Sequence, residues 1–259
     1  MVEFQEKCRV TAIEQLADDV FRLRLRAPAI AGVASPGQFV MVRVTDQFDP
    51  LLRRPFSLHS LSSDGISLLF KVVGRGTAML ANCQINDLVD LVGPLGRGFA
   101  IEDREGAVCL IGGGMGIAPL LFLAQRLARL RHPMAADRIL LGARNKEEID
   151  TLVCDFSELG YTVQVATDDG SLGHHGLVPD LLADVLPQVT QVYTCGPHVM
   201  MKTITSRCER VGVRCQVSLE AHMACGLGAC LGCTLEGPDG LFIHVCKQGP
   251  VFDSREVQW

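Results

Sequence analysis

The sequence lacks the features that mark nucleic-acid-binding and exported proteins. It has no dense basic run, and 24 Lys and Arg residues against 29 Asp and Glu residues give a formal net charge of −5. Because nucleic acid is attracted to clustered positive charge, we expect no nucleic-acid partner. Residues 1–7 have neither the apolar core of a secretory signal nor the arginine-rich pattern of a transit peptide. We therefore expect a cytoplasmic location.

One uncharged stretch, residues 107–123, approaches the length of a membrane span. Gly112, Gly113, Gly114 and Pro119 divide it. These residues predict a short buried strand, a tight turn and the start of a helix, and not one continuous helix. We expect no association with a membrane.

Length and composition favour a globular protein with more than one domain. A chain of 259 residues with 48% hydrophobic and 20% charged residues can bury sizeable cores and exceeds the usual length of one domain. Its eleven cysteines should be mostly reduced in the cytoplasm, so disulfides are a poor explanation for them. Four are clustered. The scattered ones fit the role of small buried apolar residues, and they are Cys8, Cys83, Cys109, Cys154, Cys195, Cys208 and Cys215.

The pattern of hydrophobic residues changes twice along the chain. Short β-type runs such as residues 20–26 and 38–44, separated by Pro and Gly turns, predict an antiparallel sheet or a closed barrel. Apolar strands then alternate with helical patterns, of which residues 119–130, 177–186 and 198–207 are examples, and this alternation predicts a parallel α/β domain.

The expected fold is therefore multidomain and of mixed α and β type. An antiparallel β-barrel occupies residues 1–102, and an α/β nucleotide-binding domain with a parallel sheet occupies residues 103–216. A subdomain rich in Gly and Cys occupies residues 217–259.

Cys225, Cys230, Cys233 and Cys246 form the pattern C-x4-C-x2-C-x12-C. The first three share the spacing of plant-type [2Fe–2S] proteins, in which thiolates hold the cluster. The glycines among them allow the backbone to wrap around a compact inorganic core and to aim N–H groups at its sulfides. Four thiolates can also hold zinc, although zinc sites usually contain two short-spaced pairs, so this alternative stays open.

Arg54, Pro55, Phe56 and Ser57 follow a proline-bounded loop on the expected barrel. Arg54 can pair with a pyrophosphate oxygen, and Ser57 can form a hydrogen bond with the edge of a flavin ring. The same four residues can also form an exposed basic turn before an edge strand. The flavin hypothesis gains support from a later strand that ends in a glycine turn, where N–H groups and the Thr77 hydroxyl can hold phosphate.

A glycine-rich turn at residues 111–119 lies where the first α/β strand meets its helix. Glycines there admit a pyrophosphate to the helix N-terminus, although the turn is not a strict G-x-G-x-x-G and can be purely structural. Residues 167–173 and 194–197 follow later strands. Because ligands of open parallel sheets bind at the carboxyl ends of the strands, these segments are also candidates for a nucleotide site.

The order of these motifs resembles the ferredoxin–NADP reductase superfamily. More specifically, residues 218–233 and 245–252 are similar to the electron-transfer subunit of NAD-dependent (class 1B) dihydroorotate dehydrogenase. The resemblance covers essentially the whole chain. Its most specific part is the cysteine tail, because ordinary plant-type ferredoxins place their last cysteine much farther away.

The resemblance implies FAD on the barrel, NAD on the α/β domain and a [2Fe–2S] cluster held by the four clustered cysteines. It places Cys195 near the nicotinamide, so we take Cys195 as the candidate catalytic residue. The implied FAD contacts are Arg54, Pro55, Phe56, Ser57, Leu69, Phe70, Lys71, Gly76 and Thr77. The candidate nucleotide contacts are Gly113, Gly114, Gly116, Pro119, Gly196 and Pro197.

The implied function is an electron relay in pyrimidine biosynthesis. A separate FMN-containing catalytic subunit would oxidise dihydroorotate, and electrons would pass through the cluster and FAD to NAD, in a heterotetramer with two copies of each subunit. One alternative is a flavin and iron–sulfur NAD(P)H reductase subunit that serves another partner, such as a hydrogenase or a sulfide dehydrogenase. Another class of alternative is a nonenzymatic scaffold that binds zinc.

Two details bear on these alternatives. A related small subunit of NADPH-linked ferredoxin reductases has an aspartate where this chain has Cys225, which favours the dihydroorotate branch. The residues alone leave the choice between NAD and NADP open, because Arg144 and Lys146, after the second α/β strand, can bind a 2′-phosphate.

Overall fold

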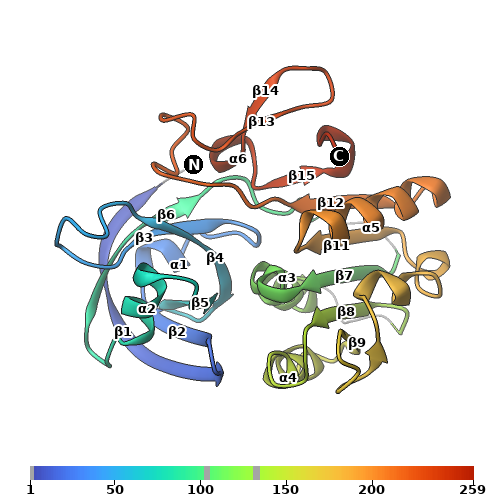
Figure 1. Cartoon of the computed structure of the whole chain (residues 1–259), viewed down its shortest axis with the longest axis horizontal. Coiled ribbons are helices and arrows are strands. Elements are labelled where there is room, and N and C mark those ends of the chain that lie inside the picture. The colour runs from blue at the N-terminus through green and yellow to red at the C-terminus, as the bar shows by residue number, and fades with distance from the viewer. Residues whose placement is uncertain (1–2, 102–105, 131–134) are drawn as a thin grey trace.

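The N-terminal part of the chain closes into an antiparallel barrel, as expected. The computed structural model describes residues 3–101, 106–130 and 135–259, and in these residues six strands surround the barrel in the order β1–β2–β5–β4–β3–β6 (Figure 1). The strands are β1 (Phe4–Ala17), β2 (Val20–Arg26), β3 (Phe39–Arg43), β4 (Arg54–Leu61), β5 (Gly65–Lys71) and β6 (Leu88–Leu95). Two short helices, α1 (Pro28–Ala31) and α2 (Arg75–Ala81), lie in the connections.

Strand β2 illustrates why these runs form a barrel. Leu23 and Leu25 are buried in the barrel core whereas Arg24 and Arg26 are exposed, so side chains alternate between the interior and the surface. Arg22 breaks this alternation. It is buried because it forms an ion pair with Asp155 of the neighbouring α/β unit.

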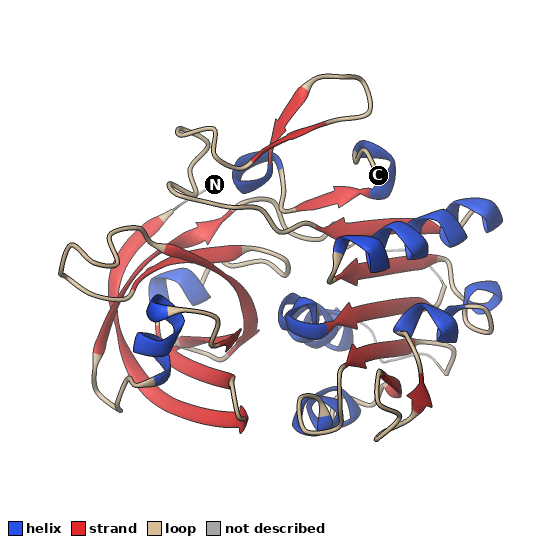
Figure 2. Ribbon diagram, in the orientation of Figure 1, coloured by secondary structure: helices blue, strands red, loops and turns tan. Residues whose placement is uncertain are grey.

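The middle of the chain, joined by β15 (Val251–Asp253) from the C-terminal segment, builds a seven-stranded sheet in the order β10–β9–β8–β7–β11–β12–β15, with helices on both faces (Figure 2). All neighbours are parallel except β15, which is antiparallel to β12. The strands of this unit are β7 (Val108–Gly113), β8 (Arg138–Ala143), β9 (Thr162–Thr167), β10 (His174–His175), β11 (Gln191–Cys195) and β12 (Arg214–Ser218). The helices are α3 (Ala118–Leu130), α4 (Asp150–Ser157) and α5 (His198–Val211), and the 3-10 turn η1 (Gly114–Ile117) precedes α3.

Strand β7 explains the long uncharged segment in the sequence. Cys109 and Ile111 are buried in the core that includes α5, whereas Leu110 is buried in the core that includes α3 and α4. A strand covered on both faces needs apolar residues on both sides, so its sequence does not alternate. In the part of the chain that the structure describes, no helix has the length and apolar character needed to cross a membrane.

The expected helix over residues 177–186 is replaced by two short 3-10 turns, η2 (Val178–Leu182) and η3 (Leu186–Gln188). Pro187 lacks a backbone N–H, so an α-helix that began at Val178 could not continue through it without losing a hydrogen bond. Val178 and Leu182 of this segment are buried in the core that includes α5, whereas Leu177 is exposed.

The C-terminal segment returns to the sheet after leaving it. Its elements are the hairpin β13 (Thr234–Glu236) and β14 (Phe242–His244), the helix α6 (Val245–Gln248), the strand β15 (Val251–Asp253) and the 3-10 turn η4 (Ser254–Glu256). Pro250 forms a bridge with Arg97 of the barrel side, and its carbonyl oxygen accepts the N–H of Leu219 at 2.9 Å. The segment is thus held by both larger units.

One of the two expected domain boundaries lies outside the described residues, and the other lies inside a strand. The boundary between residues 102 and 103 lies outside the described residues. The boundary between residues 216 and 217 lies within β12, and β15 of the third part pairs with that same strand.

The barrel meets the α/β unit where β4 packs on the start of α3. His59 of β4 is completely buried, and its Nδ1 lies 2.9 Å from the carbonyl oxygen of Ala118. Burial lowers the pKa of His59 to about 4, so the ring is neutral and Nδ1–H donates to that oxygen. This contact joins β4 of the barrel to the start of α3.

Substitution of Phe156 in α4 tests whether the core between α3, α4 and the sheet stabilises the fold. It is fully buried, so Phe156→Ala should lower the free energy of unfolding by about 3–5 kcal/mol through lost burial and a cavity. Phe48 is 90% exposed and serves as the control, with an expected change within about 0.5 kcal/mol for Phe48→Ala. Urea denaturation followed by circular dichroism measures both, and similar values for the two variants would contradict this assignment of the core.

Candidate functional site

A cavity of about 380 Å³ lies between the barrel and the α/β unit. From the barrel side, its walls include eight of the nine candidate FAD contacts, namely Arg54, Pro55, Phe56, Ser57, Leu69, Phe70, Lys71 and Thr77. Across from them lie residues of the α/β unit, among them Met115, Cys195 and Glu220. The fold therefore brings together motifs that are far apart in the sequence.

The ninth candidate, Gly76, is placed beneath the Arg54 side chain. A Cβ at residue 76 would lie 2.8 Å from Nε of Arg54, so a larger residue there would displace the Arg54 side chain from this position. The Thr77 hydroxyl is already used within this turn, because it accepts the N–H of Val73 at 2.9 Å and donates to the carbonyl oxygen of Gly74 at 2.9 Å. A cation beside a glycine turn on the wall of this cavity suits a flavin with a phosphate tail.

Aromatic rings form one wall of the same cavity. Phe56 and Phe70, which line the cavity, are in edge contact with their ring centroids 5.7 Å apart, and Phe21, outside the cavity lining, stacks on Phe70 at 5.9 Å. Such a wall suits a flat apolar ring system. Lys71 lies at the edge, and its ammonium is held by Glu148 at 2.9 Å and by Asp19 at 3.1 Å.

A second cavity, of about 650 Å³, lies at the carboxyl ends of β7 and β11. It is lined by five of the six candidate nucleotide contacts, namely Gly113, Gly114, Gly116, Gly196 and Pro197. Pro119 is buried in the first turn of α3 and is not among the residues that line either cavity. Pro119 therefore shapes the helix start, and any contact with a nucleotide would be indirect.

Three residues line both cavities: Met115, Leu219 and Glu220. Sequence reasoning did not select them as site residues. Two signals could have found them: all three lie in segments that the sequence analysis singled out, residues 111–119 and 218–233. Leu219 and Glu220 also follow the carboxyl end of β12, and Met115 lies in the turn after β7. Burial raises the pKa of Glu220 above its ordinary value.

Cys195 is the last residue of β11. It lines the cavity of about 380 Å³ between the barrel and the α/β unit, called the flavin-side cavity from here on. Burial, together with the negative charge of Glu220, raises the pKa of Cys195 to about 12. The side chain is thus a neutral thiol and not a thiolate nucleophile. This limits the candidate catalytic residue to a contact role beside the reacting groups.

The four clustered cysteines surround one loop with several backbone donors. The N–H of Leu227 points at Sγ of Cys225 at 3.3 Å, and the N–H of Gly228 points at Sγ of Cys246 at 3.1 Å. The N–H of Cys246 points at Sγ of Cys233 at 3.4 Å. Donors of this kind stabilise thiolates that ligate a metal cluster.

The sulfurs interact in two pairs. Burial opposes ionisation of Cys225, but hydrogen bonds from the N–H of Leu227 and from Cys230 lower its pKa to about 6. Burial and a hydrogen bond with Cys233 raise the pKa of Cys246 to about 12. Among the described residues, no three metal-binding side chains converge on one point.

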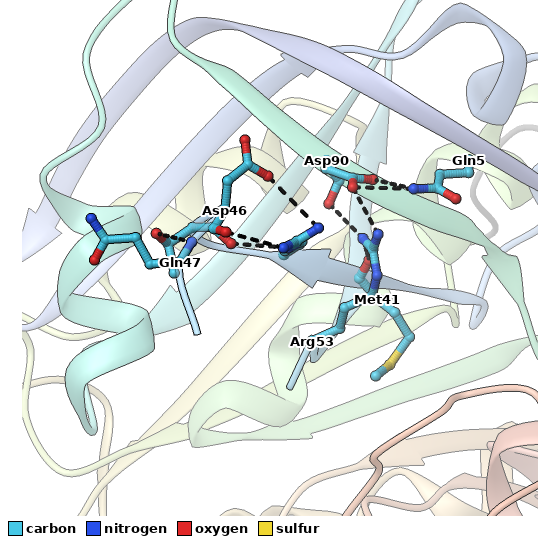
Figure 3. A network of polar contacts seen from close by, with 8 residues as sticks. Gln5, Met41, Asp46, Gln47, Arg53 and Asp90 are labelled. Carbon is cyan, nitrogen blue, oxygen red and sulfur yellow. Dashed lines mark hydrogen bonds and ion pairs between the residues drawn. The ribbon is translucent and has the colours of Figure 1, made fainter. Parts of the chain in front are cut away.

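Arg53 attaches the loop before β4 to the barrel through contacts with Asp90 and Met41 (Figure 3). Its guanidinium donates to the Asp90 carboxylate at 2.8 Å and to the carbonyl oxygen of Asp90 at 2.9 Å, and Gln5 also donates to that carboxylate. Arg53 further lies 3.4 Å from the carbonyl oxygen of Met41, whose side chain lies against Gly226. Arg53 is therefore engaged within the barrel, whereas the neighbouring Arg54 lines the cavity between the barrel and the α/β unit.

Three family models match successive parts of the chain. Residues 7–99 match the oxidoreductase FAD-binding domain, and residues 110–206 match the oxidoreductase NAD-binding domain. Residues 220–258 match the iron-sulfur cluster binding domain of dihydroorotate dehydrogenase B.

Solved structures support the fold. A structure described as NADH-dependent reduced ferredoxin-NADP oxidoreductase, in work on flavin-based electron bifurcation, has a TM-score of 0.85 and 31% identity over 98% of this chain and 90% of that chain. A ferredoxin NADP+ reductase from Neisseria gonorrhoeae with bound FAD and NADP has a TM-score of 0.67 at 17% identity, over 80% of this chain and 92% of that chain. The second likeness bears on the fold alone.

Curated relatives align from end to end. The dihydroorotate dehydrogenase B (NAD(+)), electron transfer subunit of Desulforamulus reducens is 41% identical over 97% of each chain. The protein of the same name from Caldanaerobacter subterraneus subsp. tengcongensis is 35% identical over 99% of each chain. The chain therefore belongs to the family of electron transfer subunits of dihydroorotate dehydrogenase B.

Proposed function

We propose that this chain transfers electrons between a catalytic subunit that oxidises dihydroorotate and NAD, as part of pyrimidine biosynthesis. The observation that carries the proposal is the shared wall between the two cavities, where Met115, Leu219 and Glu220 line both. A flavin in one cavity and a nicotinamide in the other would then meet at this wall. The names of the curated relatives support the substrate and the partner.

The protein's own residues prepare the cavities for this chemistry. Arg54 would hold the FAD pyrophosphate, and the rings of Phe56 and Phe70 would exclude water from one side of the flavin. The Cys195 thiol keeps its proton because its pKa is about 12, so it adds no charge beside the nicotinamide. When bound, FAD can exchange single electrons with an iron–sulfur cluster and a hydride with NAD.

The exposed side of the cysteine loop is proposed to face the partner subunit. Cys230 is exposed, and around it Leu227 and Leu231 are 46% and 59% exposed, with Phe242 on the neighbouring hairpin at 69%. Apolar side chains on a cluster-bearing loop favour a protein contact there, which would also shield the cluster from water. We propose an FMN-containing catalytic subunit as the partner, in an assembly with two copies of each.

A second candidate function has support from one observation. The likeness to the NADH-dependent reduced ferredoxin-NADP oxidoreductase, at 31% identity and a TM-score of 0.85, favours a flavin and iron–sulfur reductase that serves another partner. The higher identity of 41% to a dihydroorotate dehydrogenase subunit favours the first candidate. The cytoplasmic location expected from the sequence stays a prediction.

Loss of one cysteine tests the cluster assignment. Purified protein should contain about two irons and two acid-labile sulfides per chain, and Cys230→Ser should lose visible absorbance from the cluster. Cys154→Ser is the matched control, because Cys154 is also an exposed cysteine but lies on α4. Zinc without sulfide in the unchanged protein would contradict the cluster and favour a zinc-binding scaffold.

Removal of the Arg54 guanidinium tests the flavin site. Arg54→Ala should raise the Kd for FAD by about tenfold to a hundredfold, because one charge-assisted contact with a phosphate is lost. Arg26→Ala is the control, since Arg26 is an exposed arginine that pairs with Asp64 away from the cavity. Titration of the apoprotein by flavin fluorescence measures both. Chromatography of the released flavin should give FAD, and FMN would contradict the residue assignments.

Reconstitution tests the partner. The chain alone should oxidise NADH with an artificial acceptor but should not oxidise dihydroorotate, and addition of the FMN-containing catalytic subunit should give dihydroorotate-dependent reduction of NAD. Cys230→Ser should stop that transfer while NADH oxidation continues. Turnover of dihydroorotate by the chain alone, or full transfer in the Cys230→Ser complex, would overturn the proposed relay.

A further inference from the structure

The cavity of about 650 Å³ at the carboxyl ends of β7 and β11, the nucleotide cavity, has one wall that does not come from the α/β unit. Leu235 and Glu236 of β13 and Ile243 of β14 line it, together with Val257 and Gln258 near the end of the chain. All five belong to the segment that carries the four clustered cysteines. The glycine turns after β7 and β11 form the α/β side of the cavity. The nucleotide cavity is therefore built from two parts of the chain.

Two contacts anchor the last residues of the chain beside this cavity. Nε1–H of Trp259 donates to the carbonyl oxygen of Ser254 at 2.9 Å, which folds the tail back onto the 3-10 turn η4. The Trp259 ring also lies against the imidazole of His198, with the ring centroids 5.3 Å apart. His198 is the first residue of α5 and itself lines the cavity. Because Val257 is buried in the core, Gln258 is held at the cavity between two anchored neighbours.

The nucleotide cavity lacks the cations that would hold a ligand by ion pairs. Its lining residues, all within the described part of the chain, include the acidic Glu220 and Glu236 but neither Lys nor Arg. A pyrophosphate placed here would therefore be met by backbone N–H groups, which the glycine turn after β7 and the first turn of α5 offer. The other polar groups of a nicotinamide dinucleotide, its ribose hydroxyls and its carboxamide, need neutral partners.

Gln258 supplies the kind of neutral partner that such a ligand needs. Among the described residues that line the cavity, it has the one side-chain amide. An amide offers two N–H donors and a carbonyl acceptor, which match both a hydroxyl and a carboxamide. The Gln258 side chain is exposed, and within the described ranges of the chain its amide takes part in no hydrogen bond. The amide is therefore available to a ligand.

We propose that Gln258 binds the nicotinamide dinucleotide and that Trp259 positions it, so that the cysteine-bearing segment completes the nucleotide site. Gln258 is the group that touches the ligand. Trp259 acts through it, because its contacts with His198 and Ser254 hold the tail in place. The proposal rests on the proposed function only in assigning the nicotinamide dinucleotide to this cavity.

Truncation of the amide tests the contact. In the full chain with FAD and cluster bound, Gln258→Ala should raise KM for NADH by about fivefold to tenfold, with ferricyanide as acceptor, because hydrogen bonds with the ligand are lost. The kcat value should stay within about twofold, since the effect is on binding. Calorimetry with NAD+ should show a rise in Kd by a similar factor. The visible absorbance of flavin and cluster should not change.

Substitution of Trp259 tests the positioning role. Trp259→Ala should raise KM for NADH as Gln258→Ala does, whereas Trp259→Phe keeps a ring on His198 and should stay within about twofold of the unchanged protein. Trp259 is also the only tryptophan of the chain, so its fluorescence reports on the tail. Saturating NAD+ should change this emission, because the ligand would lie beside Gln258. An emission that NAD+ leaves unchanged would contradict the proposal.

Arg255→Ala is the matched control. Arg255 lies in the same tail, but it is exposed, pairs with Asp253 and is not among the residues that line the cavity. KM for NADH should therefore stay within about twofold of the unchanged protein. An unchanged KM and Kd in Gln258→Ala, or an equal rise in Arg255→Ala, would overturn the proposal. These measurements need no dihydroorotate or partner subunit, so a failed reconstitution would contradict the proposed relay and leave the assignment of Gln258 intact.

Discussion

The packing of β4 on the start of α3 is the contact on which the arrangement of both cavities depends. Residues 54–57 at the beginning of β4 line the flavin-side cavity, and the turn before α3 lines the nucleotide cavity. The neutral, fully buried His59 donates to Ala118 and fixes these two segments relative to each other. A charged or displaced side chain at residue 59 would separate two surfaces that must share a wall for hydride transfer.

The return of the C-terminal segment to the sheet positions the cysteine loop. Strand β15 pairs with β12, Pro250 bridges to Arg97, and Gly226 lies against Met41 of β3. The loop is thereby anchored at several points while Cys230 stays exposed. A cluster in such a loop would be close to the barrel on one side and accessible to a partner on the other, which an electron relay requires.

Ion pairs across the interface between the two units complement this apolar packing. Arg22 pairs with Asp155, and Lys71 pairs with Glu148, so both contacts join a barrel strand to the region of α4. Because these side chains are mostly buried, removal of one partner would leave a poorly solvated charge. Glu148 is shared between Lys71 of the barrel and Arg144 of the loop after β8.

The sequence by itself determined the local elements and the order of the motifs. Three features could be recognised without the fold, because each depends only on residues near one another in the sequence. They are the alternation of apolar and charged residues in β2, the apolar run of β7 and the spacing of the clustered cysteines. Only the tertiary structure decided which residues share a cavity, that β15 joins β12, and that Arg144 is occupied by Glu148. These features depend on contacts between segments far apart in the chain, and a one-dimensional pattern contains no information on which distant side chains meet.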